Sequence, residues 1–208
     1  MPLIRRQPGA AAPSGPGAPA SVDALTRGTD DDRWSAARAA ASDPDAAAAL
    51  GDAVAHERNP RVREAMFTSL SRIGTPASVE ALLPLLRSDD SALRTGALDA
   101  LRAMKDVVRP YVADLTRDPD SDVRLLACEL VRTLPSEDAS ALLCALLDAE
   151  REPNVCASVI EVLAEVGGAD ALPALARCKD RFGAIPFLAF SITVTADRIR
   201  SQSPAQRG

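Results

Sequence analysis

The chain has 208 residues and a formal net charge of −5, and 47% of its residues are hydrophobic while only 3% are aromatic. Alanine, leucine and valine must therefore form the core, and alanine and leucine favour helices. The charge excludes the broad basic surface of a dedicated nucleic-acid-binding protein, and no apolar run reaches the length of about 18 residues that a transmembrane helix needs. We expect an all-α cytoplasmic protein that binds neither nucleic acid nor membrane.

The first residues of the chain, 1–20, contain five prolines and three glycines, a composition that predicts a disordered tail. They include no apolar segment of a secretory signal. A short helix is expected over Val22–Arg27, and a second tail over 201–208. Arginine outnumbers lysine 22 to 2, which indicates a G+C-rich, bacterial coding bias.

A segment recurs about every thirty residues between these tails. Each copy has an acidic or Asn-Pro turn, then a Val or Leu, usually an Arg, and then an apolar run. The Val or Leu positions, which we call the anchor positions, are 31, 30 and 32 residues apart: Val62, Leu93, Val123 and Val155. Weaker copies place Trp34 and Ile185 at anchor positions. A period of this length predicts a solenoid of stacked units over 21–200.

The repeat divides the chain into helix pairs separated by Pro and Gly turns. The first helices of the pairs, the A helices, are expected at Asp45–Glu57, Ser78–Arg87, Val108–Thr116, Asp138–Ala149 and Ala171–Cys178. The second helices, the B helices, are expected at Asp32–Ala41, Arg61–Ile73, Ala92–Met104, Asp122–Leu134, Asn154–Val166 and Ala184–Arg200.

One apolar stripe runs along the B helices at helical spacing. Counted from the anchor, it occupies position +4 (Met66, Ala97, Ala127, Val159), position +8 (Leu70, Leu101, Val131, Leu163) and position +11 (Ile73, Met104, Leu134, Val166). We predict that this stripe is buried.

The turn acids and arginine of DDSALR (Asp89–Arg94) and DPDSDVR (Asp118–Arg124), with the closing Ile-Gly of SRIGT (Ser71–Thr75), resemble HEAT repeats. The resemblance is to the short bacterial type of the phycobilisome-lyase HEAT-like family, and it covers residues 30–167 well. It implies a right-handed α-solenoid of five to six helix pairs. The family includes bilin lyase subunits and isomerases as well as plain scaffolds. Cys156 and Pro186 replace the arginine, and the degenerate last repeat is typical of a cap.

The arginine after the anchor is expected to bridge the repeats. Arg63, Arg94 and Arg124 would contact turn acids of their own or a neighbouring unit, because a guanidinium is a planar fork that suits carboxylates. The available partners are Asp89, Asp90, Asp118, Asp120 and Asp122.

Charged residues recur on the side of the B helices opposite the apolar stripe. They form an acidic row and a second row that is basic and then acidic, and both would line a concave surface. A binding strip for a protein partner would comprise Arg72, Asp99, Arg102, Glu129, Arg132, Glu161 and Glu165. The alternative is a solvated face with i,i+3 pairs Asp99–Arg102 and Glu129–Arg132.

Aromatic residues cluster at the ends of the repeat region. Trp34 is expected to pack under the N-terminal edge. Phe182, Phe187 and Phe190 accompany apolar residues of the last repeat. They form either a buried cap or an exposed apolar patch that binds a partner or a second copy of the chain.

No residue pattern indicates a catalytic, metal or cofactor site. The four cysteines (Cys128, Cys144, Cys156, Cys178) contain no CxxC pair, and we interpret them as reduced thiols that act as small apolar residues. His56-Glu57 resembles the His-Glu dipeptides of HEAT-type di-iron hydroxylases, which need several such pairs. A single pair favours a surface histidine at a helix C-terminus.

The pattern therefore predicts a non-enzymatic scaffold or regulatory subunit that binds a protein on its concave B-helix surface. The alternative from the family resemblance is a lyase or isomerase subunit that acts on a tetrapyrrole-bearing protein. DNA-damage recognition would need a basic surface lined by aromatic residues, whereas Arg72, Arg102 and Arg132 lie beside carboxylates and no aromatic residue is expected there.

Overall fold

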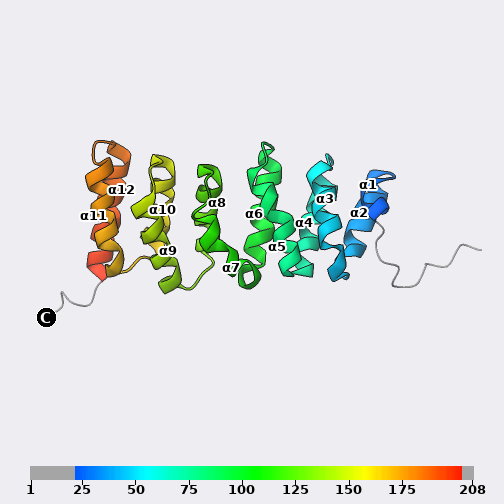
Figure 1. Cartoon of the computed structure of the whole chain (residues 1–208), viewed down its shortest axis with the longest axis horizontal. Helices are drawn as coiled ribbons and strands as arrows, with labels where there is room; N and C mark the ends of the chain where they lie inside the picture. The colour runs from blue at the N-terminus through cyan, green and yellow to red at the C-terminus, as the bar shows by residue number, and fades with distance from the viewer. Residues whose placement is uncertain (1–21, 203–208) are drawn as a thin grey trace, which may run out of the picture.

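The computed structural model describes residues 22–202, which form helices and no strand. Six helix pairs follow one another along a single elongated array, with α1 and α12 at opposite ends (Figure 1). The predicted all-α solenoid of five to six helix pairs is confirmed. The predicted tails lie outside the described residues, apart from Ser201 and Gln202, which end the last helix.

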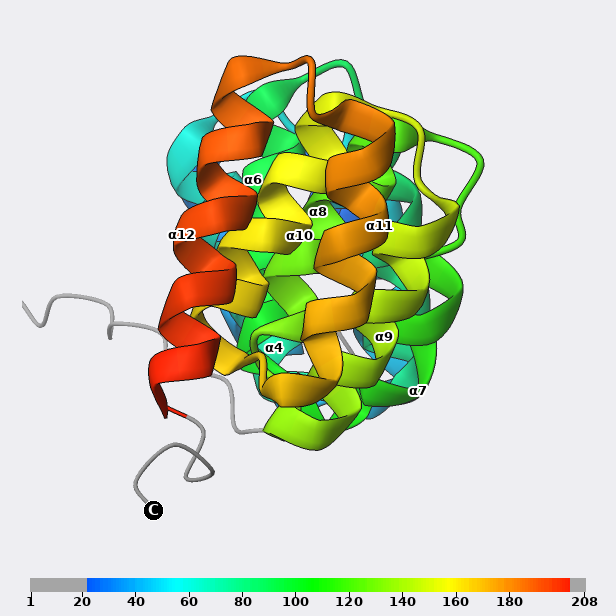
Figure 2. The ribbon, with the colours of Figure 1, turned by 90° about the vertical axis from the view of Figure 1, so that its left-hand side faces the viewer.

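Each pair contributes one helix to each of two layers, which Figure 2 shows along the array. The A helices are α1 (Val22–Thr26), α3 (Ala47–His56, after the 3₁₀ turn Pro44–Ala46), α5 (Pro76–Leu82, continued by the 3₁₀ helix Leu83–Arg87), α7 (Lys105–Leu115), α9 (Ser136–Ala149) and α11 (Leu172–Phe182, after the 3₁₀ turn Ala169–Ala171). The B helices are α2 (Asp30–Ala40), α4 (Pro60–Ile73), α6 (Ser91–Ala103), α8 (Ser121–Val131), α10 (Pro153–Val166) and α12 (Pro186–Gln202).

The turn residues of the repeat start the B helices. The side chain of Asn59 caps α4 by accepting hydrogen bonds from the backbone amides of Arg61 and Val62. The side chains of Asp90 and Asp120 likewise accept hydrogen bonds from backbone amides at the starts of α6 and α8. Such a side chain satisfies amides that have no partner within the helix. In these helices the anchor is therefore the third residue after the N-cap, which fixes the register of everything that follows it.

The apolar stripe forms the core, as predicted. Every residue at positions +4 and +8 of the four central B helices has no exposed surface, and Met104 and Leu134 at position +11 are also buried. Ile73 and Val166 are half-buried against the core. The B helices pack against one another in sequence, so this core runs continuously from repeat to repeat.

The register of the two terminal repeats differs from the prediction. In α2 the N-cap is Thr29, so the anchor position falls on Asp32 and not on Trp34. In α12 the buried residues Leu188, Ile192, Thr195, Ala196 and Ile199 reproduce the spacing of Val155, Val159, Val162, Leu163 and Val166 in α10. The anchor of the last repeat is therefore Leu188 and not Ile185, because it lies 33 residues after Val155 and not 30.

Candidate functional site

One exposed face runs along all six B helices on the side away from the A helices. When the anchors of α2 and α12 are corrected, the same positions of each repeat contribute to this face. They are the position just before the anchor and positions +2, +6, +9 and +10 after it. We call it the B-helix face, and its main residues are Trp34, Arg38, Arg61, Glu64, Thr68, Arg72, Asp99, Arg102, Glu129, Arg132, Glu161, Glu165, Phe187, Phe190 and Val194. All seven predicted charged residues lie on it.

Arg132 of α8 is the hub of an ion-pair cluster on this face. Its Nε lies 3.2 Å from Glu129 Oε1, its Nη2 lies 3.3 Å from Glu161 Oε1, and its Nη1 binds Glu165. The hydrogen bond to Glu165, opposed by partial burial, raises the pKa of Arg132. One guanidinium meets three carboxylates here, so the surface over α8 and α10 keeps an excess of negative charge.

The predicted charged residues on α4 and α6 are not grouped around one ion-pair hub as those near Arg132 are. Of the two predicted i,i+3 pairs, Glu129–Arg132 forms, but Asp99–Arg102 does not appear among the ion pairs of residues 22–202. Arg72, Asp99 and Arg102 are exposed. Beside Asp99 a groove of about 440 Å³ lies between α4 and α6, and its lining includes Phe67 and Gly96, which contact each other.

The N-terminal end of the face carries an aromatic residue that the sequence analysis did not place there. Trp34 is half-buried against the core, as expected for the N-terminal edge, but its ring also lies between two guanidinium groups. Arg38 Cζ is 4.6 Å and Arg61 Cζ is 4.5 Å from the ring centroid. The expectation that the face has no aromatic residue was wrong, because the misplaced anchor put Trp34 on the buried side.

The C-terminal end of the face is apolar. Phe187, Phe190 and Val194 are 48%, 69% and 51% exposed. Their spacing of three and four residues places them along one side of α12, at the positions equivalent to the charged residues of the other B helices. Phe182 is half-buried, with Arg181 Cζ 5.5 Å from its ring centroid. The charged strip and the apolar patch are therefore neighbouring parts of one face.

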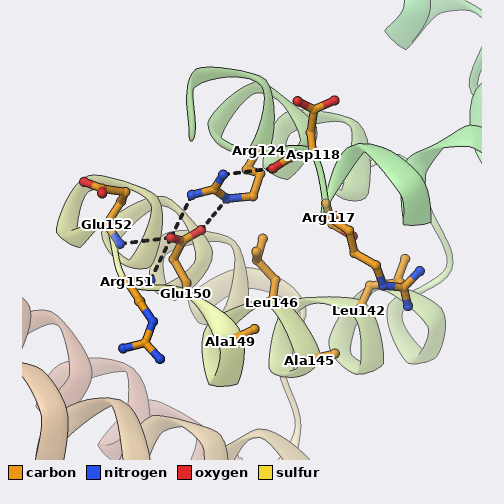
Figure 3. A pocket seen from close by; sticks show the side chains of 11 residues that line it. Arg117, Asp118, Arg124, Leu142, Ala145, Leu146, Ala149, Glu150, Arg151 and Glu152 are labelled. Atoms are coloured by element: carbon orange, nitrogen blue, oxygen red, sulfur yellow. Dashed lines mark hydrogen bonds and ion pairs between the residues drawn. The ribbon is translucent and has the colours of Figure 1, made fainter. Parts of the chain in front are cut away.

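A second feature lies at the turns between repeats (Figure 3). Glu150, which ends α9, is buried and accepts two hydrogen bonds from Arg124, at 2.7 and 2.9 Å. The amides of Arg151 and Glu152 also donate to Glu150, at 2.8 and 2.9 Å. Burial alone would raise the pKa of Glu150, but these hydrogen bonds outweigh it and lower the pKa. Glu150 therefore stays ionised.

The same arrangement recurs in the first repeats. Arg33 Nε lies 2.6 Å from Glu57 Oε2, and the amides of Arg58 and Asn59 donate to Glu57 Oε1. The hydrogen bond from Arg33, with burial opposing it, lowers the pKa of Glu57 to about 2. Each Arg–Glu pair joins the start of a B helix to the end of an A helix in the adjacent pair.

The arginine prediction is therefore correct only in part. Arg63 Nη1 does bind the turn acid Asp90, at 2.8 Å. Arg94 donates to the main-chain oxygen of Ser88, and Arg124 binds Glu150, which was not among the expected partners. The missed glutamates share a signal, the related segments ERNP (57–60) and EREP (150–153), in which the glutamate directly follows an A helix.

The pocket of Figure 3 is an apolar groove of about 550 Å³ beside Glu150. Leu142, Leu146 and the small side chains of Ala145 and Ala149 project into it from α9, and charged residues lie around them. Because Glu150 is bound to Arg124 and to two backbone amides, it stays in its ion pair beside this apolar surface.

The four cysteines are free thiols, as predicted, and Cys144 is half-buried against the core. Cys128, Cys156 and Cys178 are buried in the core, and burial raises the pKa of Cys128 to about 11. His56 is exposed at the end of α3. Within residues 22–202 no three side chains of ligand type are grouped to hold a metal ion, and no helix there is long and apolar enough to cross a membrane.

Comparison with known proteins supports the repeat assignment. A family model for HEAT repeats matches residues 18–102 and 109–182, and no curated protein matches the chain. Similar solved structures include an archaeal HEAT-like repeat protein from Thermococcus onnurineus NA1, with 16% identity over 86% of this chain and 85% of that one and a TM-score of 0.48.

Two other solved structures are less similar. A designed armadillo repeat protein has 13% identity over 86% of this chain and 98% of its own, with a TM-score of 0.39. The complex of CpcE and CpcF of phycocyanin lyase from Nostoc sp. PCC7120 has 16% identity over 95% of this chain and 100% of that one, with a TM-score of 0.36. The family match covers most of the chain and coincides with the helix pairs, so the chain belongs to the HEAT-repeat family.

Proposed function

We propose that this chain is a non-enzymatic scaffold or regulatory subunit that binds a protein partner along its B-helix face. The observation that carries the proposal is the continuity of that face. Six helices present equivalent exposed positions, with arginines and Trp34 at one end, the Arg132 cluster in the middle and exposed apolar residues at the other. Extended solenoid surfaces of this kind suit long, segmental contacts with other proteins.

The exposed charges on the face indicate that charged contacts, and not only apolar ones, contribute to binding of the partner. Glu161 and Glu165 keep 71% and 53% of their side-chain surface exposed although both contact Arg132. Exposed charges of this kind mainly raise the association rate and select the partner. Binding should therefore weaken as salt rises, because ions screen exposed charges.

Affinity capture with two matched variants tests the proposal. Glu161→Lys changes the B-helix face, and Glu137→Lys makes the same charge change on α9, where Glu137 is exposed. The wild-type chain and the Glu137→Lys variant should capture similar amounts of a specific partner. The Glu161→Lys variant should capture less of it, and the difference should be largest at low salt. A partner bound equally by all three chains would contradict the proposed face.

The tetrapyrrole alternative predicts a different result. A lyase or isomerase subunit that acts on a tetrapyrrole-bearing protein should change the absorbance spectrum of that protein or of the free pigment when mixed with it. A scaffold should leave both spectra unchanged. The absorbance titration therefore separates the two functions without knowledge of the partner.

A further inference from the structure

The α10–α12 end of the B-helix face combines negative charge with apolar surface. Glu161 and Glu165 share the single guanidinium of Arg132 with Glu129, so this cluster has two negative charges more than positive ones. α12 packs directly against α10 and presents Phe187, Phe190 and Val194. These three are the exposed large hydrophobic residues of the described chain, so apolar exposure is concentrated beside the acidic cluster.

A ligand for this surface needs two properties. It must present cations to the two glutamates, for which the arginine fork is the best match. It must also present apolar side chains to α12, because burying an exposed phenylalanine is favourable by about 25 cal/mol for each Å² removed from water. A short segment in which apolar residues adjoin two arginines satisfies both needs.

The chain itself contains such a segment. Leu3, Ile4, Arg5 and Arg6 are consecutive, and the residues between them and α1, 7–21, include four prolines and three glycines and no charged residue. The segment therefore matches the α10–α12 surface in both charge and apolar character, and the residues between it and α1 offer no competing charge.

Length decides which copy of the segment can reach the surface. A fully extended chain of the fifteen residues 7–21 spans at most about 50 Å, and a flexible chain of that length has a root-mean-square span of about 20 Å. From α2 to α12 there are five B-helix steps of about 8–10 Å each, so the site lies about 40–50 Å away. Binding within one chain would need near-complete extension, whereas binding between two chains would not.

We propose that the Leu3–Arg6 segment of a second copy of this chain docks on the α10–α12 end of the B-helix face. Two copies placed antiparallel exchange their segments reciprocally, because the α1 end of each then lies near the α12 end of the other. Such a two-fold arrangement closes on itself as a dimer. This inference rests on the proposed function, since it names an occupant for part of the same face.

Sedimentation of the full chain at low salt tests the proposal. The wild type should show a monomer–dimer equilibrium. Arg5→Glu with Arg6→Glu, or Glu161→Lys with Glu165→Lys, should each weaken the dimer by about tenfold or more, as charge reversal at complementary interfaces does. Combining the two pairs in one chain should restore most of the loss, because the charges again complement each other. Phe190→Ser should weaken the dimer without changing its salt dependence.

Three controls make the outcome decisive. Glu137→Lys should leave the dimer unchanged. At concentrations where all chains are monomeric, every variant should have the helical circular dichroism signal and the melting temperature of the wild type. A chain lacking residues 1–20 should fold as the wild type does and remain monomeric. A labelled peptide of residues 1–20 should bind this shortened chain, and it should bind the shortened Glu161→Lys, Glu165→Lys variant at least about tenfold more weakly.

The proposal is overturned if the wild type stays monomeric, whether or not the peptide binds, or if the doubly reversed chain fails to recover. Saturable peptide binding with no dimer would mean that the segment docks within its own chain. A result that rules out the dimer does not by itself rule out partner binding on the B-helix face. A partner captured in a Glu161-dependent manner by a monomeric chain would leave the scaffold function standing with an external occupant.

Discussion

Leu101 lies at the centre of the stacked core, with none of its surface exposed. Truncation to alanine should destabilise the chain by about 2–5 kcal/mol, because it removes buried methyl groups and leaves a cavity between repeats. Urea denaturation gives the value. Thr95→Ala, at an exposed position of the same helix, should change stability by about 0.5 kcal/mol or less. An equal effect of the two substitutions would mean that the buried side of α6 is assigned wrongly.

Glu57 should make stability depend on pH in the acid range. Its pKa is about 2 in the folded chain against an ordinary 4.5, so its contribution is full above pH 4.5 and is lost as pH falls toward 2. At neutral pH Glu57→Gln should therefore cost up to about 3 kcal/mol, from about 1.4 kcal/mol for each pKa unit. Denaturation across pH 2–7 should show the stabilities of the wild type and the variant converging at the acid end.

Partners of individual charged residues are the part of this structure that the sequence predicts least well. The repeat placed Arg63, Arg94 and Arg124 correctly after each anchor, yet only Arg63 binds a turn acid. Arg124 binds Glu150 because the turn brings the end of α9 to the start of α8. A helical period determines which side of a helix a residue lies on, but the partner of a long side chain depends on how the connecting turn is folded.

At the scale of the helix, the close approach of α4 and α6 depends on Gly96. A Cβ atom at this position would lie 2.3 Å from Cε2 of Phe67, so the ring occupies the space that a side chain would need. Alanine is a better helix former than glycine by about 1 kcal/mol. Because an overpacked contact costs about 1–3 kcal/mol, Gly96→Ala should nevertheless destabilise the chain.

A double-mutant cycle separates these two effects. In the background Phe67→Leu, which removes the ring, Gly96→Ala should become neutral or stabilising, since only the helix preference remains. Urea denaturation of the four chains gives the coupling. Equal effects of Gly96→Ala in both backgrounds would show that the ring does not limit the distance between the helices.

The helices themselves were predictable because several local signals agree. The apolar period is present in α4, α6, α8 and α10, a capping side chain starts the first three, and Pro or Gly lies beside α4, α8 and α10. The predicted bounds of these helices differ from the observed ones by a few residues at most. The signals fail at the ends of the array. The anchor of α2 is the polar residue Asp32, thirty residues before Val62, so an apolar residue nearby, Trp34, was taken for it. The anchor of α12 lies 33 residues after Val155, so counting thirty residues gives Ile185 instead of Leu188. The misplaced anchors hid the aromatic residues at both ends of the candidate face.

At the scale of the whole molecule, each repeat packs mainly on its neighbours, so the chain grows in length and not in thickness. A compact globule of 208 residues would have a radius of gyration of about 17 Å. Six helix pairs at about 8–10 Å per step, with a helix diameter of about 10 Å at the ends, should instead span about 50–60 Å.

Small-angle scattering should therefore give a radius of gyration above that of the globule and a pair-distance distribution with a long tail. Residues 1–20 lie outside the described structure, so the chain lacking them is the matched comparison, and both chains should be extrapolated to zero concentration to remove any dimer. Circular dichroism of the same samples should show helix with little strand. A symmetric pair-distance distribution for the shortened chain would mean that the two ends of the array fold back on each other. Trp34 and Phe190 would then lie close together, and the B-helix face could not serve as one continuous binding surface.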